Sequence, residues 1–464
     1  MRAPFAPLFA IALVGAAAPS ARADAPQTTM TLDDALAYAR AHQPSLAAAR
    51  ARLAAAGAEV QVAKAAWLPS VGALAELVGA TTNNSTTTVI SDGAVTLPRI
   101  GATPIGSSLD WTPHASTLLA VGLRQQVYDF GRISALKAAA QALEAIERER
   151  ARGAGLDVEY AVVSAYYAVL GARGVLDVAE AARRRAQVDS DFITQAVRSG
   201  MRPPIDLTRA SAELERAEVG RLRARAGLRI ARSVLAAAIG SPCPEIDATP
   251  TATPTATARA GPATAEATAD LALSMSPLVR ALMAAVRAQE AQTNVQRSLL
   301  RPSLFLSAAF SARAGGAAPS SGPVPYGEGW LPIVPNYDVG LVLSWPVWDP
   351  VVWARKRASQ AQEAVARANL ESARLAVAHQ AVEARQQLLV AEESIPALER
   401  AEAAARANHE QAQTRLRAGL GTITELADAE AVLLDAQLAL VAGRYQLLVA
   451  RAALARLLAE SEAR

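Results

Sequence analysis

A heptad repeat near the C-terminus constrains the fold of this chain more than any other feature. Between Gly419 and Leu457, leucines recur every seven residues, and small residues recur at the same interval three places behind them. The leucines are Leu426, Leu433, Leu440, Leu447 and Leu454, and the small residues are Ala429, Ala436, Gly443 and Ala450. A sustained seven-residue period keeps one stripe of a helix against a neighbour. The pattern therefore predicts a long helix in a closely packed coiled coil.

The same stretch occurs 219 residues earlier, with Leu207 in the place of Leu426 and Gly200 in the place of Gly419. Only Arg221 interrupts the earlier leucine series. Two prolines are also repeated at a separation of 233 residues, since Pro44 and Pro69 correspond to Pro277 and Pro302. A repeat that covers most of the chain argues against chance and predicts two copies of one structural unit.

The duplication divides the chain into two repeats joined by a linker that is rich in Pro, Thr and Ala. Each repeat contains a helix, a pair of strands and a long helical hairpin. The predicted ranges are 24–240 for the first repeat, with strands at about 68–129 and the hairpin at 131–240, and 267–460 for the second, with strands at about 302–349 and the hairpin at 351–460. The linker, 241–266, is expected to have no fixed structure.

The helices predicted in the hairpins are very long. Segments 131–198 and 351–417 are each helix-compatible, and about 65 residues at 1.5 Å per residue reach on the order of 100 Å. That length far exceeds the thickness of a bilayer. We expect Pro396 to kink or break the second segment. A shorter helix is expected from a capped start at Thr31 to about Ala66.

Between the helices, the apolar period changes to two, which is typical of strands with one apolar face. The four strand segments are 69–79, 119–127, 304–311 and 337–347, and the first alternates least clearly. All six tryptophans lie in or beside these segments: Trp67, Trp111, Trp330, Trp345, Trp348 and Trp353. Such residues gather at membrane–water interfaces. Packing of a small sheet is the alternative, but their absence from the remaining helices favours a membrane.

A sheet in a membrane must close, because hydrocarbon cannot satisfy the polar groups of a free edge. Four strands cannot close alone. Two chains would give eight strands with a filled interior, and three chains would give twelve, the smallest number that leaves a lumen. The predicted fold is therefore mostly α-helical, with long antiparallel coiled-coil helices and a membrane β-barrel to which each of three chains contributes four strands.

The N-terminus indicates an exported protein. Arg2, the apolar run 8–18 and Ala21-Arg22-Ala23 predict a cleaved signal peptide over 1–23. Cys243, the only cysteine, lies far from the cleavage site, so the sequence does not predict a lipoprotein. No later stretch is uninterruptedly apolar over about 20 residues, which argues against a helical anchor.

Several function classes lack support in the sequence. The four histidines are scattered, and no nucleotide, dinucleotide or hydrolase motif is present. We therefore expect no enzyme activity, no cofactor and no metal. The formal net charge of +3 comes from interspersed charges without a basic block, so no nucleic-acid partner is expected.

With these features, the chain resembles the TolC-like outer-membrane efflux family over nearly all of the segment after the signal. The residues that carry the resemblance are the junctions Tyr128-Asp129-Phe130-Gly131 and Trp348-Asp349-Pro350, the segment 235–240 and the tips 200–206 and 419–428. The resemblance implies a trimeric outer-membrane channel. Its porin-like barrel would be surrounded by outer-membrane lipid, and its helical tunnel would form a long periplasmic portion. It also implies a periplasmic adaptor protein and an inner-membrane transporter as partners in tripartite efflux or type I secretion.

The resemblance also implies a gate at the periplasmic tip. Glu425 and Asp428, three residues apart on one helical face, would form a ring of carboxylates at the constriction. Thr422 and Glu425 also match a capping box, so a purely local role stays open. Gly421 stands where the family has a basic latch residue, which implies that the closed-state latch is built differently or is weaker.

Two further expectations concern the turns. Asp206 matches a tip acid that links neighbouring helices in the closed state, and Arg209 is an alternative partner within its own helix. The turn residues Gly200, Met201, Gly419 and Leu420 match adaptor-docking turns, and plain turn glycines are the alternative. Because the two turns differ in their charged residues, we expect opening to move the second hairpin more than the first.

Two other functions compete with a duct. A periplasmic adaptor also carries a coiled-coil hairpin, but it would need a lipoyl-like or β-barrel domain that two separated strand pairs do not supply. A structural periplasmic coiled coil would not need strands with one apolar face.

Overall fold

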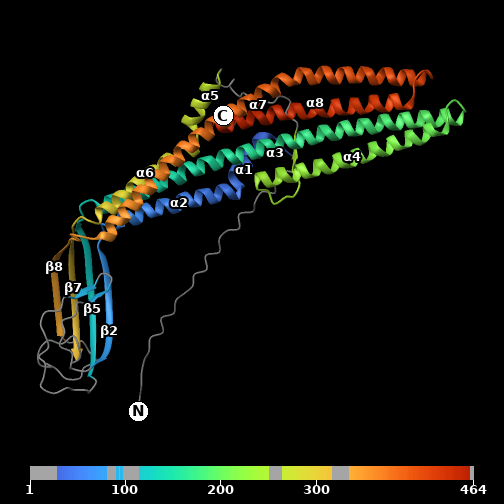
Figure 1. Ribbon diagram of the computed structural model, residues 1–464. Helices are drawn as coiled ribbons and strands as arrows, with labels where there is room; N and C mark the ends of the chain where they lie inside the picture. Colours follow the sequence, from blue (N-terminus) through green and yellow to red (C-terminus); the bar gives the residue numbers. More distant parts are fainter. Residues whose placement is uncertain are drawn as a thin grey trace, which may run out of the picture.

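The computed structural model describes residues 29–80, 90–92, 95–97, 114–249, 264–315 and 334–459. The described chain is elongated, with a curved sheet at one end and long helices running away from it (Figure 1). The helices are α1 Leu32–His42, α2 Pro44–Ala65, α3 Arg132–Arg198, α4 Pro204–Ile239, α5 Ala265–Met275, α6 Pro277–Ser298, α7 Pro350–Arg417 and α8 Ile423–Leu457. The long strands are β2 Ser70–Ala80, β5 His114–Tyr128, β7 Ser303–Gly315 and β8 Val334–Ser344.

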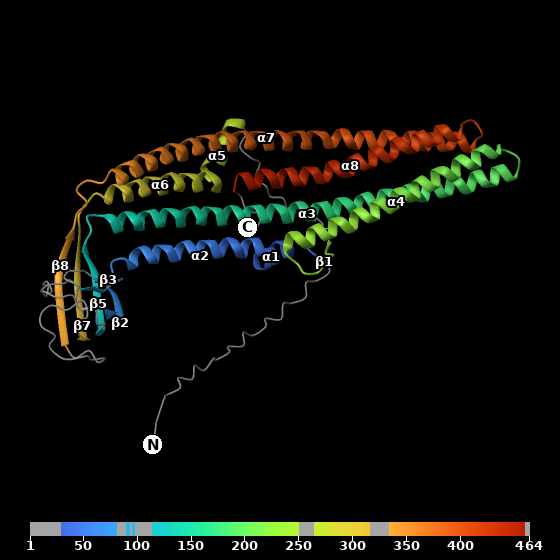
Figure 2. The same cartoon turned by 60° about the horizontal axis from the view of Figure 1, so that its bottom comes forward.

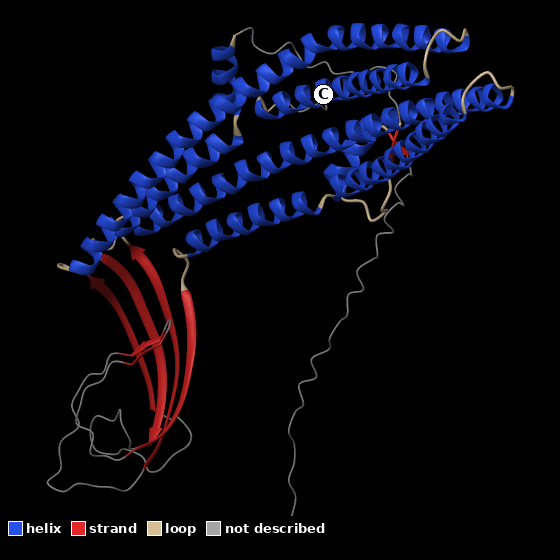
Figure 3. Cartoon of the chain, turned by 45° about the vertical axis from the view of Figure 1, so that its right-hand side comes forward, coloured by secondary structure: helices blue, strands red, loops and turns tan. Residues whose placement is uncertain are grey.

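The long strands form one antiparallel sheet in the order β2-β5-β7-β8, drawn in red in Figure 3. Each of the four predicted strand segments overlaps one of these strands, but the last one, 337–347, lies three residues too far along, since β8 ends at Ser344. Two shorter pairs also form: β1 Thr29–Met30 with β6 Asp247–Ala248, and β3 Ile90–Asp92 with β4 Val95–Leu97. Both pairs were missed in the sequence, because runs of two or three residues show no period.

The register gives the sheet two chemically different faces. Val121 lies opposite Phe310, and Phe310 lies opposite Tyr337, so one face is apolar from strand to strand. These three side chains are 52%, 57% and 77% exposed. The other face is more polar, with Arg124 opposite Ser307 and Ser307 opposite Gly340. The predicted alternation is therefore confirmed in the sheet.

The hairpin helices follow the predicted bounds closely. α3 and α7 are continuous over 67 and 68 residues. The expected break at Pro396 is absent, because α7 runs through this residue. Pro396 is exposed, so water can satisfy the carbonyl that the proline ring leaves without its N–H partner.

Two prolines divide the shorter helices instead. The single helix expected from Thr31 to Ala66 ends at His42 and restarts at Pro44, because Gln43 takes the extended conformation that a following proline favours. Ser276 does the same before Pro277, and α5 and α6 meet at a bend of 51°. The predicted cap at Thr31 is confirmed as a capping box with Asp34.

The heptad stripe of α8 packs as predicted near both of its ends, where Leu426, Leu433 and Leu454 are buried. In its middle, the small residues allow close contact. A Cβ on Gly443 would lie 2.5 Å from Leu398 Cδ1 of α7. On α3, a Cβ on Gly171 would lie 3.3 Å from Tyr445 Cδ2 of α8, and a Cβ on Gly174 would lie 3.0 Å from Val441 Cγ1 of α8. Judged by length and composition alone, α3 and α8 are also apolar enough to cross a membrane.

The expectation that the linker has no fixed structure is wrong for its first residues. Ile246 is fully buried, and Asp247 accepts hydrogen bonds of 2.6 Å from both Arg173 of α3 and Arg232 of α4. This double contact holds the segment after α4 against the middle of the hairpin. Residues 250–263 lie outside the described residues.

Tryptophans mark the junction between sheet and helices. Trp67 follows α2, Trp345 and Trp348 lie between β8 and α7, and Trp353 lies in the first turn of α7. All four side chains are exposed, by 40% to 76%. Trp111 and Trp330 lie outside the described residues.

Replacing Gly240 by alanine should destabilise the chain more than replacing Gly200 by alanine. Both glycines have positive φ, +74° and +76°, so both substitutions strain the backbone. A Cβ at Gly240 would also lie 2.9 Å from Gln43 Cα, whereas none at Gly200 would meet an atom within 4 Å. The additional overlap should cost about 1–3 kcal/mol. Thermal unfolding midpoints of the two variants test this, and equal midpoints would contradict it.

Candidate functional site

The two helical hairpins end together, at the end of the chain farthest from the sheet (Figure 2). The turn between α3 and α4 contains Gly200, and the turn between α7 and α8 contains Gly419, with φ angles of +76° and +75°. Met201 N–H donates to Ala196 O and Leu420 N–H donates to Arg415 O, both at 2.9 Å. These bonds satisfy the last carbonyls of α3 and α7, so the duplicated turns have one backbone design.

Each turn projects an apolar side chain. Met201 is 73% exposed and Leu420 is 75% exposed. A residue at this position of a helix-ending turn commonly packs back onto its own helix. The exposure of both side chains therefore leaves an apolar group at each tip for contact with another surface.

Arg202 connects the two tips within one chain. Its Nη2 donates to Leu416 O at 3.0 Å and to Gly421 O at 3.1 Å, both in the second hairpin. Its Nη1 lies 3.7 Å from Asp206 Oδ2 in α4. Both side chains are largely buried, at 16% and 10% exposed. Asp206 thus pairs with Arg202 and not with Arg209, the partner considered in the sequence.

An apolar cluster lies beneath this contact and joins all four hairpin helices. It contains Ile193 of α3, Ala210 of α4, Leu416 of α7, and Ile423 and Leu426 of α8, all buried. Arg202 therefore closes the end of a shared core. Separating the two hairpins at the tip would expose this core as well as break the arginine contacts.

The two predicted gate acids lie on the exposed side of α8, at its start. Glu425 completes the capping box with Thr422, since Glu425 N–H donates to Thr422 Oγ1 at 3.2 Å and Thr422 N–H reaches Glu425 Oε2 at 3.5 Å. Arg415 Nε lies 4.0 Å from the same oxygen. Asp428 is exposed one turn later. The local role of Glu425 is therefore present, and it leaves both carboxylates at the surface.

A half-buried polar cluster around the buried His409 connects the hairpins farther from the tip. Arg185 of α3 donates from Nε and Nη2 to the carboxylate of Glu430 of α8, at 2.8 to 3.1 Å. His409 Nε2 of α7 lies 2.9 Å from the same carboxylate. Asp189 accepts from Gln413 at 3.0 Å beside them. This cluster could not be predicted from the sequence, because its members come from three helices and follow no motif.

Burial and hydrogen bonding act in opposite directions on these acids. Burial raises the pKa of Glu430, but hydrogen bonds from His409 and Arg185 outweigh it, so the pKa lies below its ordinary value. Burial raises the pKa of Asp189 above its ordinary value, because its bond from Gln413 compensates only in part. Glu430 is therefore held in its charged form.

Acidification should weaken the contribution of Glu430 to stability. Because its pKa is depressed in the folded chain, this contribution is present above the ordinary carboxyl pKa and is lost as the pH falls through the folded value. The variant Glu430→Gln should unfold at lower temperature than the wild type at pH 7, with a smaller difference near pH 3. Unfolding midpoints over this range test the sign, and a difference that grows on acidification would contradict it.

The sequence was compared with protein families and with known proteins. The sequence model of the outer membrane efflux protein family matches residues 35–241 and 268–460. Protein CyaE of Bordetella pertussis is 30% identical over 235 residues, which are 49% of this chain and 44% of CyaE. The chain thus matches less than half the length of that relative.

Solved structures share the fold over almost the whole chain. The outer-membrane channel OprN superposes with a TM-score of 0.74 at 22% identity, covering 92% of this chain and 89% of OprN. The outer membrane protein VceC from Vibrio cholerae superposes with a TM-score of 0.72 at 19% identity, covering 93% of this chain and 96% of VceC. The resemblance inferred from the duplication is confirmed: this chain belongs to the outer membrane efflux protein family.

Proposed function

We propose that this chain forms a passive exit duct that crosses the outer membrane and continues into the periplasm. The sheet carries the proposal, because its apolar face is exposed and exposed tryptophans lie where it joins the helices. Water does not favour such a face, whereas lipid does. The duct itself catalyses no reaction, and transport energy comes from a partner.

Three copies would close the sheet into a barrel of twelve strands. β2 and β8 are the edges of the sheet, and they run in opposite directions, so β8 of one copy can pair antiparallel with β2 of the next. β8 is exposed on both faces, as Leu341 at 65% and Val342 at 39% illustrate. Free edges are not tolerated in hydrocarbon, which supports closure by identical copies.

The oligomer is testable directly. Chemical cross-linking of the detergent-solubilised chain should give a ladder that ends at the trimer. A ladder that ends at the dimer would favour a filled barrel of eight strands, and a chain that stays monomeric and soluble after export would contradict the duct.

The tip fits a periplasmic adaptor. Met201 and Leu420 project apolar side chains from the two turns, next to glycines that hold the turns in shape. Three copies would present six such groups in a ring. An adaptor docked there would couple the duct to an inner-membrane transporter, which supplies the energy.

Arg202 holds the closed state in this proposal. It would take the role of the basic latch residue that the family has at the position of Gly421. It comes from the opposite hairpin and donates to the carbonyl of Gly421 itself. The second hairpin would swing outward when the duct opens. A covalent cross-link between the turns 200–209 and 419–428 should therefore stop transport.

Glu425 and Asp428 would form the carboxylate ring of the gate. The double variant E425Q/D428N should lower the preference for cations, because it removes six negative charges per trimer while glutamine preserves the helix cap. The control E266Q/D270N removes the same charge from α5, away from the tip. Reversal potentials in a salt gradient measure the effect. Equal shifts of the reversal potential in both variants would show that Glu425 and Asp428 have no special role in the gate.

A further inference from the structure

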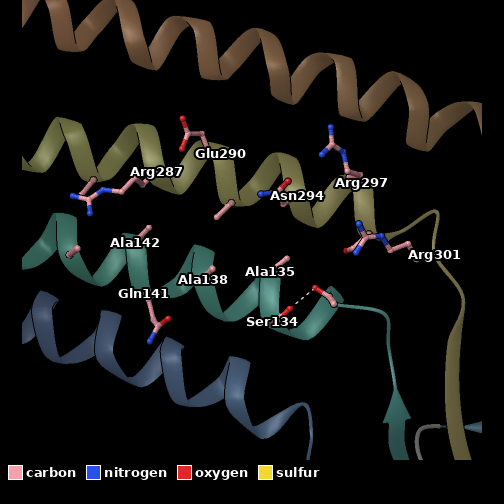
Figure 4. Close-up of a pocket in the computed structure, with 15 residues that line it drawn as sticks. Ser134, Ala135, Ala138, Gln141, Ala142, Arg287, Glu290, Asn294, Arg297 and Arg301 are labelled. Carbon is pink, nitrogen blue, oxygen red and sulfur yellow. Dashed lines mark hydrogen bonds between the residues drawn. The ribbon is translucent and has the colours of Figure 1, made fainter.

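A basic cleft lies between α3 and α6, at the end of these helices nearest the sheet (Figure 4). Its volume is about 680 Å³. Alanines of both helices form the floor: Ala135, Ala138, Ala142, Ala145, Ala284 and Ala291. The polar side chains come mainly from one stripe of α6 and its end, which contributes Arg287, Asn294, Arg297 and Arg301. The cleft is therefore lined by small side chains on its floor and carries a positive charge.

The charge of the cleft is not balanced by its own lining. Glu290 is its only acid, and Glu290 Oε1 already accepts from Arg367 of α7 at 2.9 Å. Arg297 and Arg301 are four residues apart, and bonds from Leu300 N–H to Arg297 O and from Arg301 N–H to Ser298 O continue the helical path between them. Like charges at this spacing repel each other. Both side chains lie at the end of the cleft nearest the sheet (Figure 4), and an anion bound there would offset their positive charge.

Three contacts tie the mouth of the cleft to the apolar face of the sheet. Arg301 Nη1 donates to Phe130 O at 2.7 Å, and the ring of Phe130 packs edge-on against Tyr128. A bulge in β5 sets Tyr128 opposite Leu304, on the apolar side. Trp345 Nε1 donates to Leu300 O at 3.3 Å, beside Arg301. The mouth therefore lies at the level of the aromatic residues, where a membrane surface would begin.

We propose that Arg297 and Arg301 bind the phosphate of an anionic phospholipid headgroup in the periplasmic leaflet of the outer membrane. The inference rests on the proposed insertion of the sheet into that membrane. A guanidinium group offers paired donors that match phosphate oxygens, and basic residues next to a bilayer attract anionic lipid. Lys356, stacked over Trp353 at 5.0 Å, extends the positive charge to α7 at the same level.

Binding of fluorescent phosphatidylglycerol to the detergent-solubilised full chain tests this site, with fluorescent phosphatidylcholine as the neutral comparison. Wild type should bind phosphatidylglycerol more tightly. The variant R297Q/R301Q should bind it roughly tenfold more weakly, since two charges near the headgroup are lost. The single variant R297Q, which keeps the contact between Arg301 and Phe130, should show part of the loss. The control R223Q/R225Q on α4 removes equal charge from exposed positions and should bind as wild type does.

Equal affinity for the two lipids, or unchanged affinity in R297Q/R301Q, would overturn the proposal. Inorganic phosphate at millimolar concentration should not displace the lipid. Displacement by phosphate alone would make the cleft an anion site without a lipid role, which also overturns it. A trimer that conducts in bilayers but shows no lipid preference would refute this inference alone, whereas a chain that does not enter bilayers would refute the duct.

Discussion

Replacing Val339 by arginine should prevent the chain from assembling in a bilayer, whereas replacing the next residue, Gly340, by arginine should not. Val339 lies on the apolar face, in the middle of β8, and is 70% exposed. A charged side chain facing lipid near the bilayer midplane costs roughly 2–4 kcal/mol, and each of three copies would carry one. The fraction of protein that inserts into liposomes and resists extraction by carbonate measures this effect.

Gly340 is the matched control because it lies one residue along the same strand, on the opposite face. A Cβ there meets no atom within 4 Å, so the longer side chain has space. Insertion should therefore be close to that of the wild type. If both variants insert equally well, the apolar face does not face lipid. If both fail, β8 is sensitive to any arginine, and the variant Ser307→Arg on the same polar face of β7 decides between the faces.

Replacing Arg202 by alanine should open the tip without an adaptor. The variant loses two hydrogen bonds from a charged donor, worth roughly 1.5–3 kcal/mol each, and it leaves Asp206 without its partner. The two hydrogen bonds exist only while the hairpins are together, whereas the pair of Arg202 with Asp206 lies within the first hairpin and is lost in both states. The open fraction should therefore rise about tenfold or more, seen as higher conductance in planar bilayers.

The variant Arg209→Ala separates this role from simple loss of charge. Arg209 lies on the same helix turn as Asp206 but is exposed, so its removal should leave the conductance unchanged. Higher conductance in both variants would assign the effect to net charge at the tip. An unchanged conductance in R202A would show that the closed state is held elsewhere, and the half-buried pair of Arg185 and Glu430 would be the next to test.

Much of the architecture could be predicted from periodicity. The heptad stripe predicted α8, its duplicate predicted α4, and the change to a period of two located the strands, because helices and strands bury apolar residues at different intervals. At Pro396, where local propensity predicts a kink or a break, no break occurs, because α7 continues through this residue. A helix that packs along most of its length compensates for one lost hydrogen bond on its exposed side.

The contacts that close the tip could be predicted only in part. The capping role of Glu425 could be predicted, because its partner Thr422 is three residues away. The role of Arg202 could not be predicted, because its acceptors are backbone carbonyls 214 and 219 residues later, and every residue carries a carbonyl. Its spacing from Asp206, four residues along the chain, was the one available signal. The linker was misread for a similar reason, because Asp247 is fixed by arginines from two distant helices.

Single-channel recording of the purified chain in a planar bilayer shows whether the chain forms a duct. We expect steady ohmic conductance without nucleotide or partner protein, small in the wild type and larger in R202A. A chain that is folded and trimeric but leaves the bilayer insulating, in the wild type and in R202A alike, would not be an exit duct.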